Sequence, residues 1–336
     1  MERRHAVTER PGTMQRLPFF LPMVRCPRRC VYCDQGEITG IGRIPSPEDV
    51  ARALSSLDGP REVCYFGGSF TCLPPDRRTA YLSAVLNAPK GSTVRFSTHP
   101  ECITGQVLSE LAPYPVSMVE LGISSLDDSV LAVCNRGYTG RLVLDTMALV
   151  LARKFALCAQ MMIGLPGQTE ESSREDLRRM AAMKGAAPMT LRIYPCLVLE
   201  NTPLARSHAS GSYSPLSVDE AVLWAGRLLH EARHLGFAVQ RIGLQESESL
   251  ARSVIAGPHH PAFGELAAAE ALVWSLLERN PEGPWSVDGT LVSQLTGHGK
   301  YGIRRLAERS GLTVRAVEER LVFTSAGGAK GAAALP

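Results

Sequence analysis

The stretch Pro22-Met-Val-Arg-Cys26-Pro-Arg-Arg-Cys30-Val-Tyr-Cys33-Asp-Gln-Gly36 places three cysteines in the spacing C-x3-C-x2-C. The residues before it are apolar, so we expect the cysteines on a loop that follows a buried strand. A structural zinc site takes four protein ligands, whereas three cysteines on one loop can hold a 4Fe-4S cluster and leave one iron open. The spacing therefore favours an iron-sulfur site with Cys26, Cys30 and Cys33 as its ligands.

The neighbours of these cysteines suit an anionic cluster. Arg25, Arg28 and Arg29 make the loop electropositive, which we expect to lower the pKa of the thiols and to stabilise negative charge. Tyr32 is expected to cover the cluster or to contact a ligand bound to it. From the residues alone two other interpretations stay open: a C-x2-C redox pair, or a zinc site completed by a distant fourth cysteine.

The motif Cys26-Pro-Arg-Arg-Cys30-Val-Tyr-Cys33 resembles the signature of the radical S-adenosylmethionine (radical SAM) enzymes. The resemblance implies that the amine and carboxylate of S-adenosyl-L-methionine (SAM) chelate the open iron. It further implies that an electron cleaves SAM to methionine and a 5'-deoxyadenosyl radical, which abstracts hydrogen from a substrate. A reducing electron donor such as flavodoxin or ferredoxin is implied with it.

Length and composition limit the class of protein. A chain of 336 residues, 45% of them hydrophobic, can bury one large core with a smaller appendage. No apolar run reaches membrane-spanning length and the N-terminus lacks the apolar centre of a signal peptide, so a cytoplasmic protein with reduced thiols is expected. The cysteines outside the loop are expected to be mostly small, buried, apolar residues: Cys64, Cys72, Cys102, Cys134, Cys158 and Cys196.

A strand-loop-helix rhythm runs through most of the chain. Strands are expected at residues 17–24, 62–66, 93–97, 117–123, 155–163 and 189–194, and helices after them. Ser46-Pro47, Ser172-x-x-Glu175 and Ser217-x-x-Glu220 have the pattern of helix starts. Six such units imply an α/β fold with a parallel sheet, either open or a partial barrel. The resemblance favours a partial (β/α)6 TIM-like barrel with the cluster after its first strand.

Further segments, in the expected order, resemble the SAM-binding motifs of the family. Gly67-Gly68-Ser69 corresponds to the motif that meets the SAM amine, and glycine there lets bare backbone approach a ligand. Arg136 corresponds to the arginine that pairs with the SAM carboxylate, a role suited to a guanidinium. Gln160 to Thr169 resemble the fifth-strand motif beside adenine and ribose. The SAM contacts implied by the resemblance are Tyr32, Gly67, Gly68, Ser69, Ser97, Ser124, Ser125, Arg136, Gln160 and Gly164.

Phrases after residue 190 resemble the branch that includes the catalytic subunit of Elongator and its tRNA-modifying relatives. They begin at Arg192, Arg241 and Ala256. The branch implies an RNA or tRNA substrate. Two features of the Elongator enzyme differ from what we expect here: its first two cysteines are farther apart, and it has an acetyltransferase domain. Oxygen-independent coproporphyrinogen oxidase shares the fourth- and fifth-strand motifs, so a tetrapyrrole-type oxidase is the alternative. A non-catalytic, metal-containing nucleic-acid-binding protein is the competing class.

The expected domains are a flexible arm at 1–16, the core barrel and its extension at 17–264, a helical region at 265–324 and a disordered tail at 325–336. Residues 303–320 have the pattern of a helix-turn-helix around Gly311, with more basic than acidic side chains. Either they contact a phosphate backbone or they form a small helical lid with a solvated face. His259 and His260 are expected in a loop at the barrel mouth, where they shape the loop or contact substrate.

Overall fold

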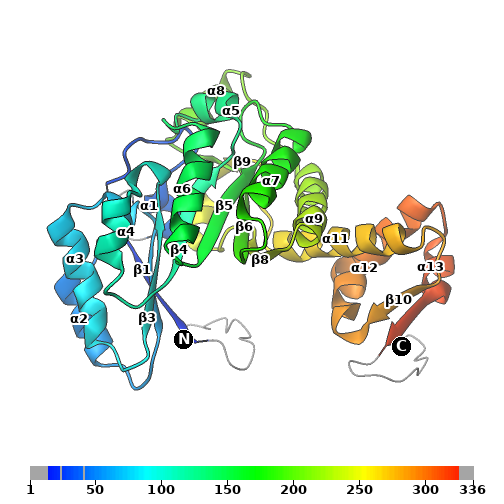
Figure 1. Ribbon diagram of the computed structural model, residues 1–336. Helices are drawn as coiled ribbons and strands as arrows, with labels where there is room; N and C mark the ends of the chain where they lie inside the picture. Colours follow the sequence, from blue (N-terminus) through cyan, green and yellow to red (C-terminus); the bar gives the residue numbers. More distant parts are fainter. Residues whose placement is uncertain (1–13, 23–24, 41, 325–336) are drawn as a thin grey trace. The chain divides into compact units, whose positions relative to one another are not determined.

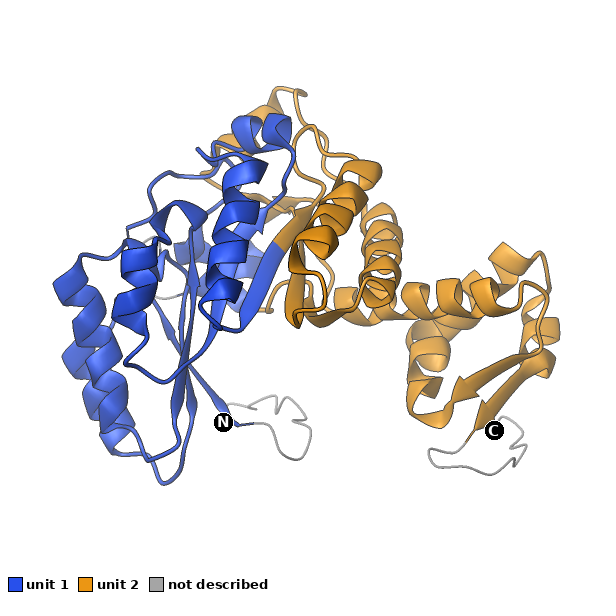
Figure 2. Cartoon of the chain, in the orientation of Figure 1, with its two compact units in different colours: residues 1–160, 247–253 blue, residues 161–246, 254–336 orange. Residues whose placement is uncertain are grey.

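The computed structural model describes residues 14–22, 25–40 and 42–324. The chain divides into two compact units, one of residues 1–160 with 247–253, the other of residues 161–246 with 254–336 (Figure 2). The expected arm and tail, and the end of the first expected strand, fall largely or wholly outside the described residues. None of the helices among the described residues is both long and apolar enough to cross a membrane.

Seven strands form the main sheet, in the order β1-β2-β3-β4-β5-β6-β8 (Figure 1). Their bounds are β1 Arg16–Phe20, β2 Glu62–Phe66, β3 Thr93–Thr98, β4 Val116–Ser124, β5 Leu157–Ile163, β6 Met189–Pro195 and β8 Phe237–Ile242. The pairs β1-β2, β2-β3, β3-β4 and β6-β8 are parallel. Since parallel neighbours end at the same edge, the loops after β1 to β4 gather the candidate site residues of the first unit.

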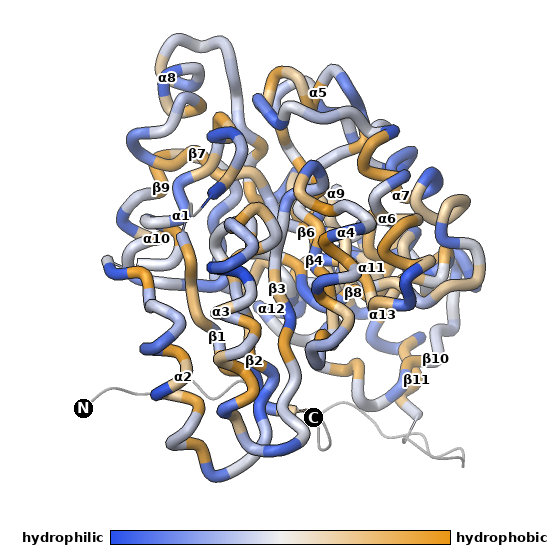
Figure 3. The backbone as a smooth tube through the Cα atoms, turned by 60° about the vertical axis from the view of Figure 1, so that its left-hand side comes forward, coloured by the Kyte–Doolittle hydropathy of each residue, from blue (hydrophilic) through white to orange (hydrophobic). Residues whose placement is uncertain are grey.

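The first unit contains helices between and after its strands. They are α1 Gln35–Thr39, α2 Pro47–Ser55, α3 Pro75–Ala84, α4 Gly105–Leu111, α5 Asp128–Val133, α6 Gly140–Ala152 and α10 Glu248–Ser253, with the 3-10 turns η1 Phe70–Cys72, η2 Val85–Asn87 and η3 Pro100–Cys102. Ser46 caps α2 in a capping box with Asp49, and Pro47 occupies the first turn, as predicted. Hydrophobic and hydrophilic residues alternate along α2 (Figure 3), and its buried side includes Val50 and Leu54.

The second unit contains the rest of the sheet and the longer helices. Its elements are α7 Glu170–Lys184, β7 Val198–Leu199, α8 Pro203–Ala209, α9 Val218–His234, β9 Val254–Ala256, α11 Phe263–Arg279, β10 Trp285–Asp288, η4 Gly289–Leu291, α12 Val292–Ser310, α13 Val314–Arg320 and β11 Leu321–Thr324. The predicted capping box of Ser217 and Glu220 is present at α9. The capping box predicted at Ser172 is wrong. Thr169 is the N-cap residue of α7, which begins at Glu170, and Ser172 is the third helical residue, whose side chain completes the box with Thr169.

Residues 272–321 pack around a small core of their own. Trp285, Leu295, Ile303, Leu306 and Val317 are among its buried side chains. α12 ends where Gly311 adopts a left-handed conformation, and α13 starts after the capping residue Thr313. The glycine-centred turn predicted between two helices is therefore present, and β10 pairs with β11 beside it.

Candidate iron-sulfur and SAM site

Backbone contacts hold the cysteine loop against the segment that carries Arg136. The Val31 amide donates to the Cys134 carbonyl at 3.2 Å, and the Asn135 amide nitrogen Nδ2 donates to the Arg29 carbonyl at 2.9 Å. The Cys33 amide donates to the Cys30 carbonyl at 3.1 Å, which closes a tight turn between the second and third cysteines. These bonds fix the loop in place although its side chains Arg25, Arg28 and Arg29 are exposed.

None of the three loop cysteines is in a disulfide, and each has a polar neighbour. Cys26 Sγ lies 3.4 Å from Ser69 Oγ, Arg136 Nη1 donates to Cys30 Sγ at 3.0 Å, and Gln35 Nε2 donates to Cys33 Sγ at 3.7 Å. These polar contacts orient the sulfurs from three different segments. Cys30 is buried, and the other two are half-buried.

The expectation that the basic loop lowers the thiol pKa values is wrong for two of the cysteines. Burial raises the pKa of Cys26, and burial followed by the neighbouring thiols Cys30 and Cys26 raises the pKa of Cys33 to about 12. The physical reason is that the loop arginines point to solvent while the sulfurs face the interior, so desolvation of the thiolates outweighs distant positive charge. A bound metal centre would have to displace these protons.

The spread of the three sulfurs bears on which metal group fits. Among the described residues, the one group of three metal-type ligands whose atoms all lie within 4.8 Å of one another consists of His230, His234 and Glu278. At least one pair of the three Sγ atoms is therefore more than 4.8 Å apart. A single tetrahedral zinc ion needs its ligands close together, whereas in a 4Fe-4S cluster each thiolate binds a separate iron. Three thiols on one loop are a donor set that fits the cluster.

Arg136 lies buried behind the loop with its donors directed at several partners. Besides Cys30, its Nε donates to the Tyr138 hydroxyl at 2.7 Å, its Nη1 lies 3.5 Å from the Tyr32 hydroxyl, and its Nη2 donates to the Gly122 carbonyl. Burial alone would lower the pKa of Arg136, but Tyr138, Tyr32 and Cys30 hold it well above its ordinary value. The site thus contains a permanent cation beside a cluster ligand.

Tyr32 joins the loop to the end of β4. Its hydroxyl lies 2.7 Å from Ser124 Oγ, and both side chains are buried. Ser124 has a left-handed backbone (φ +59°), which turns the chain after the strand. Ser125 Oγ accepts from the Asp127 amide at 3.1 Å, so the hydroxyl of this predicted SAM contact also shapes the start of α5.

The glycine-rich motif follows β2. Gly67 has φ +87°, and a Cβ atom there would lie 3.4 Å from the backbone of Pro22. A residue with a side chain would be strained in this conformation, which explains glycine at this position. Ser69 is buried beside Cys26. The motif is therefore placed against the cysteine loop.

A network of polar side chains connects the neighbouring strands β2, β3, β4 and β5. Gln160 Nε2 donates to Ser97 Oγ at 3.1 Å and to Glu120 Oε2 at 2.6 Å, while Arg95 lies 3.1 Å from Glu120 and 3.4 Å from Glu62. Glu120 is fully buried. Sequence analysis named Ser97 and Gln160 but missed their charged partners, although an arginine in β3 and a glutamate in β4, both otherwise buried strands, were signals for such a pair.

His99 follows β3 and lies close enough to Arg136 and Arg28 for their charges to act on it. The sequence did not single it out. Its ring meets the Tyr138 ring edge-on at 4.8 Å. Burial, then the charge of Arg136, lowers the pKa of His99 to about 3, even though Glu101 lies 3.5 Å from its Nδ1. Burial and the charge of Arg136 outweigh Glu101 because that carboxylate is exposed and well solvated.

Gly164 belongs to the second unit and follows β5. It has φ +74°, and its carbonyl accepts from the Tyr213 hydroxyl at 2.7 Å. With Leu165, Gln168 and Trp224 it lines a cavity of about 270 Å³. His259 pairs with Glu246 at 3.1 Å, and His260 Nδ1 accepts from the Ala262 amide at 3.0 Å. Those contacts show both histidines supporting their loop.

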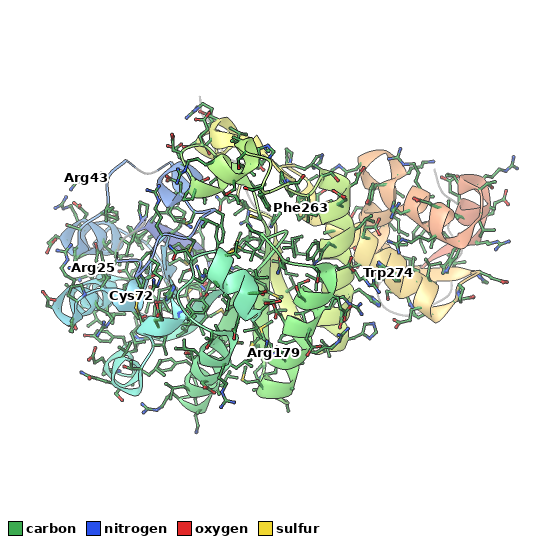
Figure 4. The ribbon with its side chains drawn as sticks, turned by 90° about the horizontal axis from the view of Figure 1, so that it is seen from above. Arg25, Arg43, Cys72, Arg179, Phe263 and Trp274 are labelled. Carbon is green, nitrogen blue, oxygen red and sulfur yellow. A yellow bond between two sulfur atoms is a disulfide. The ribbon has the colours of Figure 1, made fainter. Side chains whose placement is uncertain are left out.

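Cys72 and Cys102 form a disulfide, which corrects the expectation that they are buried thiols (Figure 4). The two residues end the turns η1 and η3, which follow the neighbouring strands β2 and β3. Parallel pairing brings both turns to one edge of the sheet and places the two Cα atoms 5.1 Å apart. Cys64, Cys134, Cys158 and Cys196 are buried and outside any disulfide, as expected.

The basic residues of the helix-turn-helix are mostly engaged within the chain. Glu270 on α11 pairs with Arg305 and with Arg309, Lys300 pairs with Glu318, and Arg315 pairs with Glu319. Arg304 and Arg320 donate to backbone carbonyls. These pairs compensate much of the positive charge that a phosphate backbone would meet, although Arg304 and Arg320 contact only carbonyl groups.

Comparison with known proteins adds family evidence to this geometry. Residues 20–180 match the model of the Radical SAM superfamily, and residues 188–273 match the Radical_SAM C-terminal domain. The chain is homologous to Elongator complex protein 3 of Homo sapiens, with 27% identity over 188 residues, 50% of this chain and 34% of that protein. It is also homologous to tRNA uridine(34) acetyltransferase of Methanocaldococcus infernus, with 25% identity over 125 residues, 37% of this chain and 23% of that protein.

A solved structure supports the fold. The Elp3 protein of Methanocaldococcus infernus, with residues 1–46 deleted, matches with a TM-score of 0.59 and 17% identity, over 79% of this chain and 62% of that chain. The expected α/β partial barrel with a helical C-terminal region is therefore confirmed. The chain spans about a third or less of the length of the curated relatives it matches. Because both family models match, the chain belongs to the radical SAM superfamily.

Proposed function

We propose that this protein is a radical SAM enzyme that acts on RNA, with tRNA as the preferred class of substrate. The observation that carries the proposal is the group of three cysteines outside any disulfide, beside a buried arginine, on one loop of a radical SAM domain. Superfamily membership implies an enzyme, and the family generally binds a 4Fe-4S cluster and SAM. The RNA substrate is supported by the homology to Elongator complex protein 3 and to tRNA uridine(34) acetyltransferase.

Cys26, Cys30 and Cys33 would each bind one iron and leave the fourth for SAM. A bound cluster would supply the electron that splits SAM into methionine and a 5'-deoxyadenosyl radical, which requires a reductant such as flavodoxin or ferredoxin. Arg136 would hold negative charge at Cys30 and at the SAM carboxylate. Gly67, Gly68 and Ser69 would approach the SAM amine through backbone and hydroxyl groups.

The remaining proposed contacts orient the nucleoside part of SAM. Ser97 and Gln160 are hydrogen-bonded to each other, and Gln160 is also fixed by Glu120. Tyr32 is fixed by Ser124, and Ser125 stabilises the following turn. Each of these side chains therefore has a defined rotamer before any ligand binds, which lowers the entropy cost of binding.

Anaerobic reconstitution with iron and sulfide tests the chemistry. The loaded protein should convert SAM to 5'-deoxyadenosine when a reductant is supplied, and the Cys33→Ala variant should not. A reconstituted protein that holds no cluster, or whose reduced cluster leaves SAM intact, would refute the enzyme proposal.

The substrate class needs a separate experiment. Modified nucleosides of tRNA and tetrapyrroles should be compared between cells with and without the gene, complemented by the parent or by Cys33→Ala. A nucleoside that depends on intact Cys33 supports the RNA proposal. A change confined to tetrapyrroles would replace it with the alternative of a tetrapyrrole-type oxidase.

A further inference from the structure

Helices α9 and α11 bring together three potential metal ligands away from the cysteine loop. His230 and His234 are separated by one helical turn on α9, so their rings lie on the same face. Glu278 faces them from α11. Its Oε2 lies 3.4 Å from His230 Nε2 and 3.1 Å from His234 Nε2. One carboxylate oxygen is thus shared by two imidazoles.

These separations match those around a single small cation. The three ligand atoms lie within 4.8 Å of one another. In a tetrahedral zinc site with bonds of about 2.0–2.1 Å, neighbouring ligand atoms are roughly 3.3 Å apart. The two distances from the Glu278 oxygen to the imidazole nitrogens are close to that value, so an ion would fit without movement of the backbone. The i, i+4 pair of histidines is also the spacing by which one helix supplies two zinc ligands in H-E-x-x-H sites.

One ligand of the group is packed against an aromatic ring, and the other two are open to solvent. The His230 ring stacks on the Trp274 ring of α11 at 6.4 Å with an interplanar angle of 28°, and Trp274 is labelled in Figure 4. His230 is 14% exposed, whereas His234 and Glu278 are each 57% exposed, so an ion could enter from water. Arg233 lies close enough to act on His230 electrostatically and would oppose a cation. Glu231, which would favour one, is engaged by Arg174 and Arg178.

We propose that His230, His234 and Glu278 form a binding site for a zinc-class divalent cation, with the fourth coordination position open to water. Two imidazoles and one carboxylate are a donor set suited to Zn²⁺, Co²⁺ or Ni²⁺, whereas Mg²⁺ and Ca²⁺ prefer oxygen ligands alone. A bound ion would cross-link α9 to α11. Since Glu270 of α11 also binds Arg305 and Arg309 of α12, the ion would stabilise the helix on which this C-terminal region packs.

The test must separate this site from the cysteine loop, whose thiols also bind zinc. We would therefore use the full chain without a histidine tag, with Cys26, Cys30 and Cys33 changed to Ala, and titrate it with Zn²⁺ by calorimetry and with Co²⁺ by absorption. One ion per chain should bind, and Co²⁺ should give ligand-field bands without the thiolate charge-transfer bands. The parent protein, already loaded with its cluster under anaerobic conditions, should bind the same additional ion.

Ligand variants assign the site. His234→Ala and Glu278→Gln change exposed side chains and should each weaken Zn²⁺ binding at least about tenfold, since even partners outside the ligand set cost about 10–100-fold. His298→Ala is the matched control: His298 pairs with Glu265 in the same unit, and within the described part of the chain it belongs to no group of three metal-type ligands, so this variant should bind Zn²⁺ as its background does. Circular dichroism of each variant verifies folding.

Trp274 gives an independent readout because its ring lies on His230. Cu²⁺ or Ni²⁺ at the site should quench part of the tryptophan fluorescence, and His234→Ala should shift that quenching to at least about tenfold higher ion concentration. Trp274→Phe should remove the quenching while the Zn²⁺ titration persists. The proposal is overturned if no ion binds, or if binding is the same in His234→Ala and Glu278→Gln as in their common background.

Discussion

Changing Arg136 to Ala should alter the iron-sulfur site before any SAM is added. A guanidinium has five N–H donors. Here they contact Tyr138, Cys30, Tyr32 and the Gly122 carbonyl, so most of them are committed inside the protein. A bidentate contact with the SAM carboxylate would require some of these bonds to rearrange. Arg136 is thus expected to act first on the Cys30 thiolate and only then on SAM.

The magnitude follows from the hydrogen bond to Cys30. A hydrogen bond to a charged group contributes about 1.5–3 kcal/mol, and for a one-electron couple about 1.4 kcal/mol corresponds to 59 mV. The upper limit for the change in cluster potential is therefore about 65–130 mV. The reduced cluster is the more negative form and gains more from the cation, so Arg136→Ala should make the potential more negative. Arg136→Lys keeps the charge but loses the planar fork, and it should restore only part of the shift.

The assay is an anaerobic redox titration of the reconstituted protein without SAM, followed by SAM binding to the same samples. Arg141→Ala is the control, since Arg141 lies in the same unit and its side chain is 82% exposed in an ion pair with Asp145. A potential that does not change, combined with weaker SAM binding, would show that Arg136 serves the carboxylate alone. If neither quantity changes, Arg136 has no role in the site.

Three further predictions concern the cysteines, a buried carboxylate and a buried histidine. Each loop cysteine changed to Ala should abolish the visible absorbance of the reconstituted cluster, whereas Cys158→Ala should retain it; equal loss from all would mean that the wrong cysteines were chosen. Glu270→Gln should lower the free energy of unfolding in urea by about 3 kcal/mol, since it leaves Arg305 and Arg309 without their buried partner; a midpoint like the parent's would contradict this. Because His99 stays neutral in the folded state down to about pH 3, stability should fall as pH drops below the unfolded pKa of about 6.5, by about 2 kcal/mol at pH 5. His99→Gln should flatten that part of the pH profile, and an unchanged slope would exclude His99 as its source.

Local patterns predicted the elements well where the signal lies within a few residues. Strand β2 has the predicted bounds, and Ser46 and Ser217 cap the predicted helices. The helix start at Ser172 was misplaced because Thr169 is an equally good cap three residues earlier. Strand β8, at Phe237–Ile242, was not predicted. Only part of it alternates between hydrophobic and polar residues, and its partner β6 is remote in sequence.

The partners that complete the site depend on contacts between distant segments. The Cys72–Cys102 disulfide requires the pairing of β2 with β3, which a single sequence does not specify. The same holds for Arg136 and Cys30, which are 106 residues apart. The sequence motif assigned Arg136 a ligand, whereas the fold shows which protein atoms it already contacts. The residue types therefore indicated the chemistry, whereas the contacts between site residues depend on how the strands pair in the sheet.

The strongest electrostatic argument for an anion in this site is the charge balance around Arg136. Another buried arginine of the first unit, Arg95, is compensated by Glu120 and Glu62 within the sheet. Arg136 is only 7% exposed, and its contacts among the described residues are hydroxyl, carbonyl and thiol groups rather than carboxylates. Burying a charge without a counter-ion costs several kcal/mol. A thiolate at Cys30 and an anionic ligand beyond it would supply the missing negative charge. An arginine at this position is therefore expected to stabilise the loaded site at the expense of the empty one.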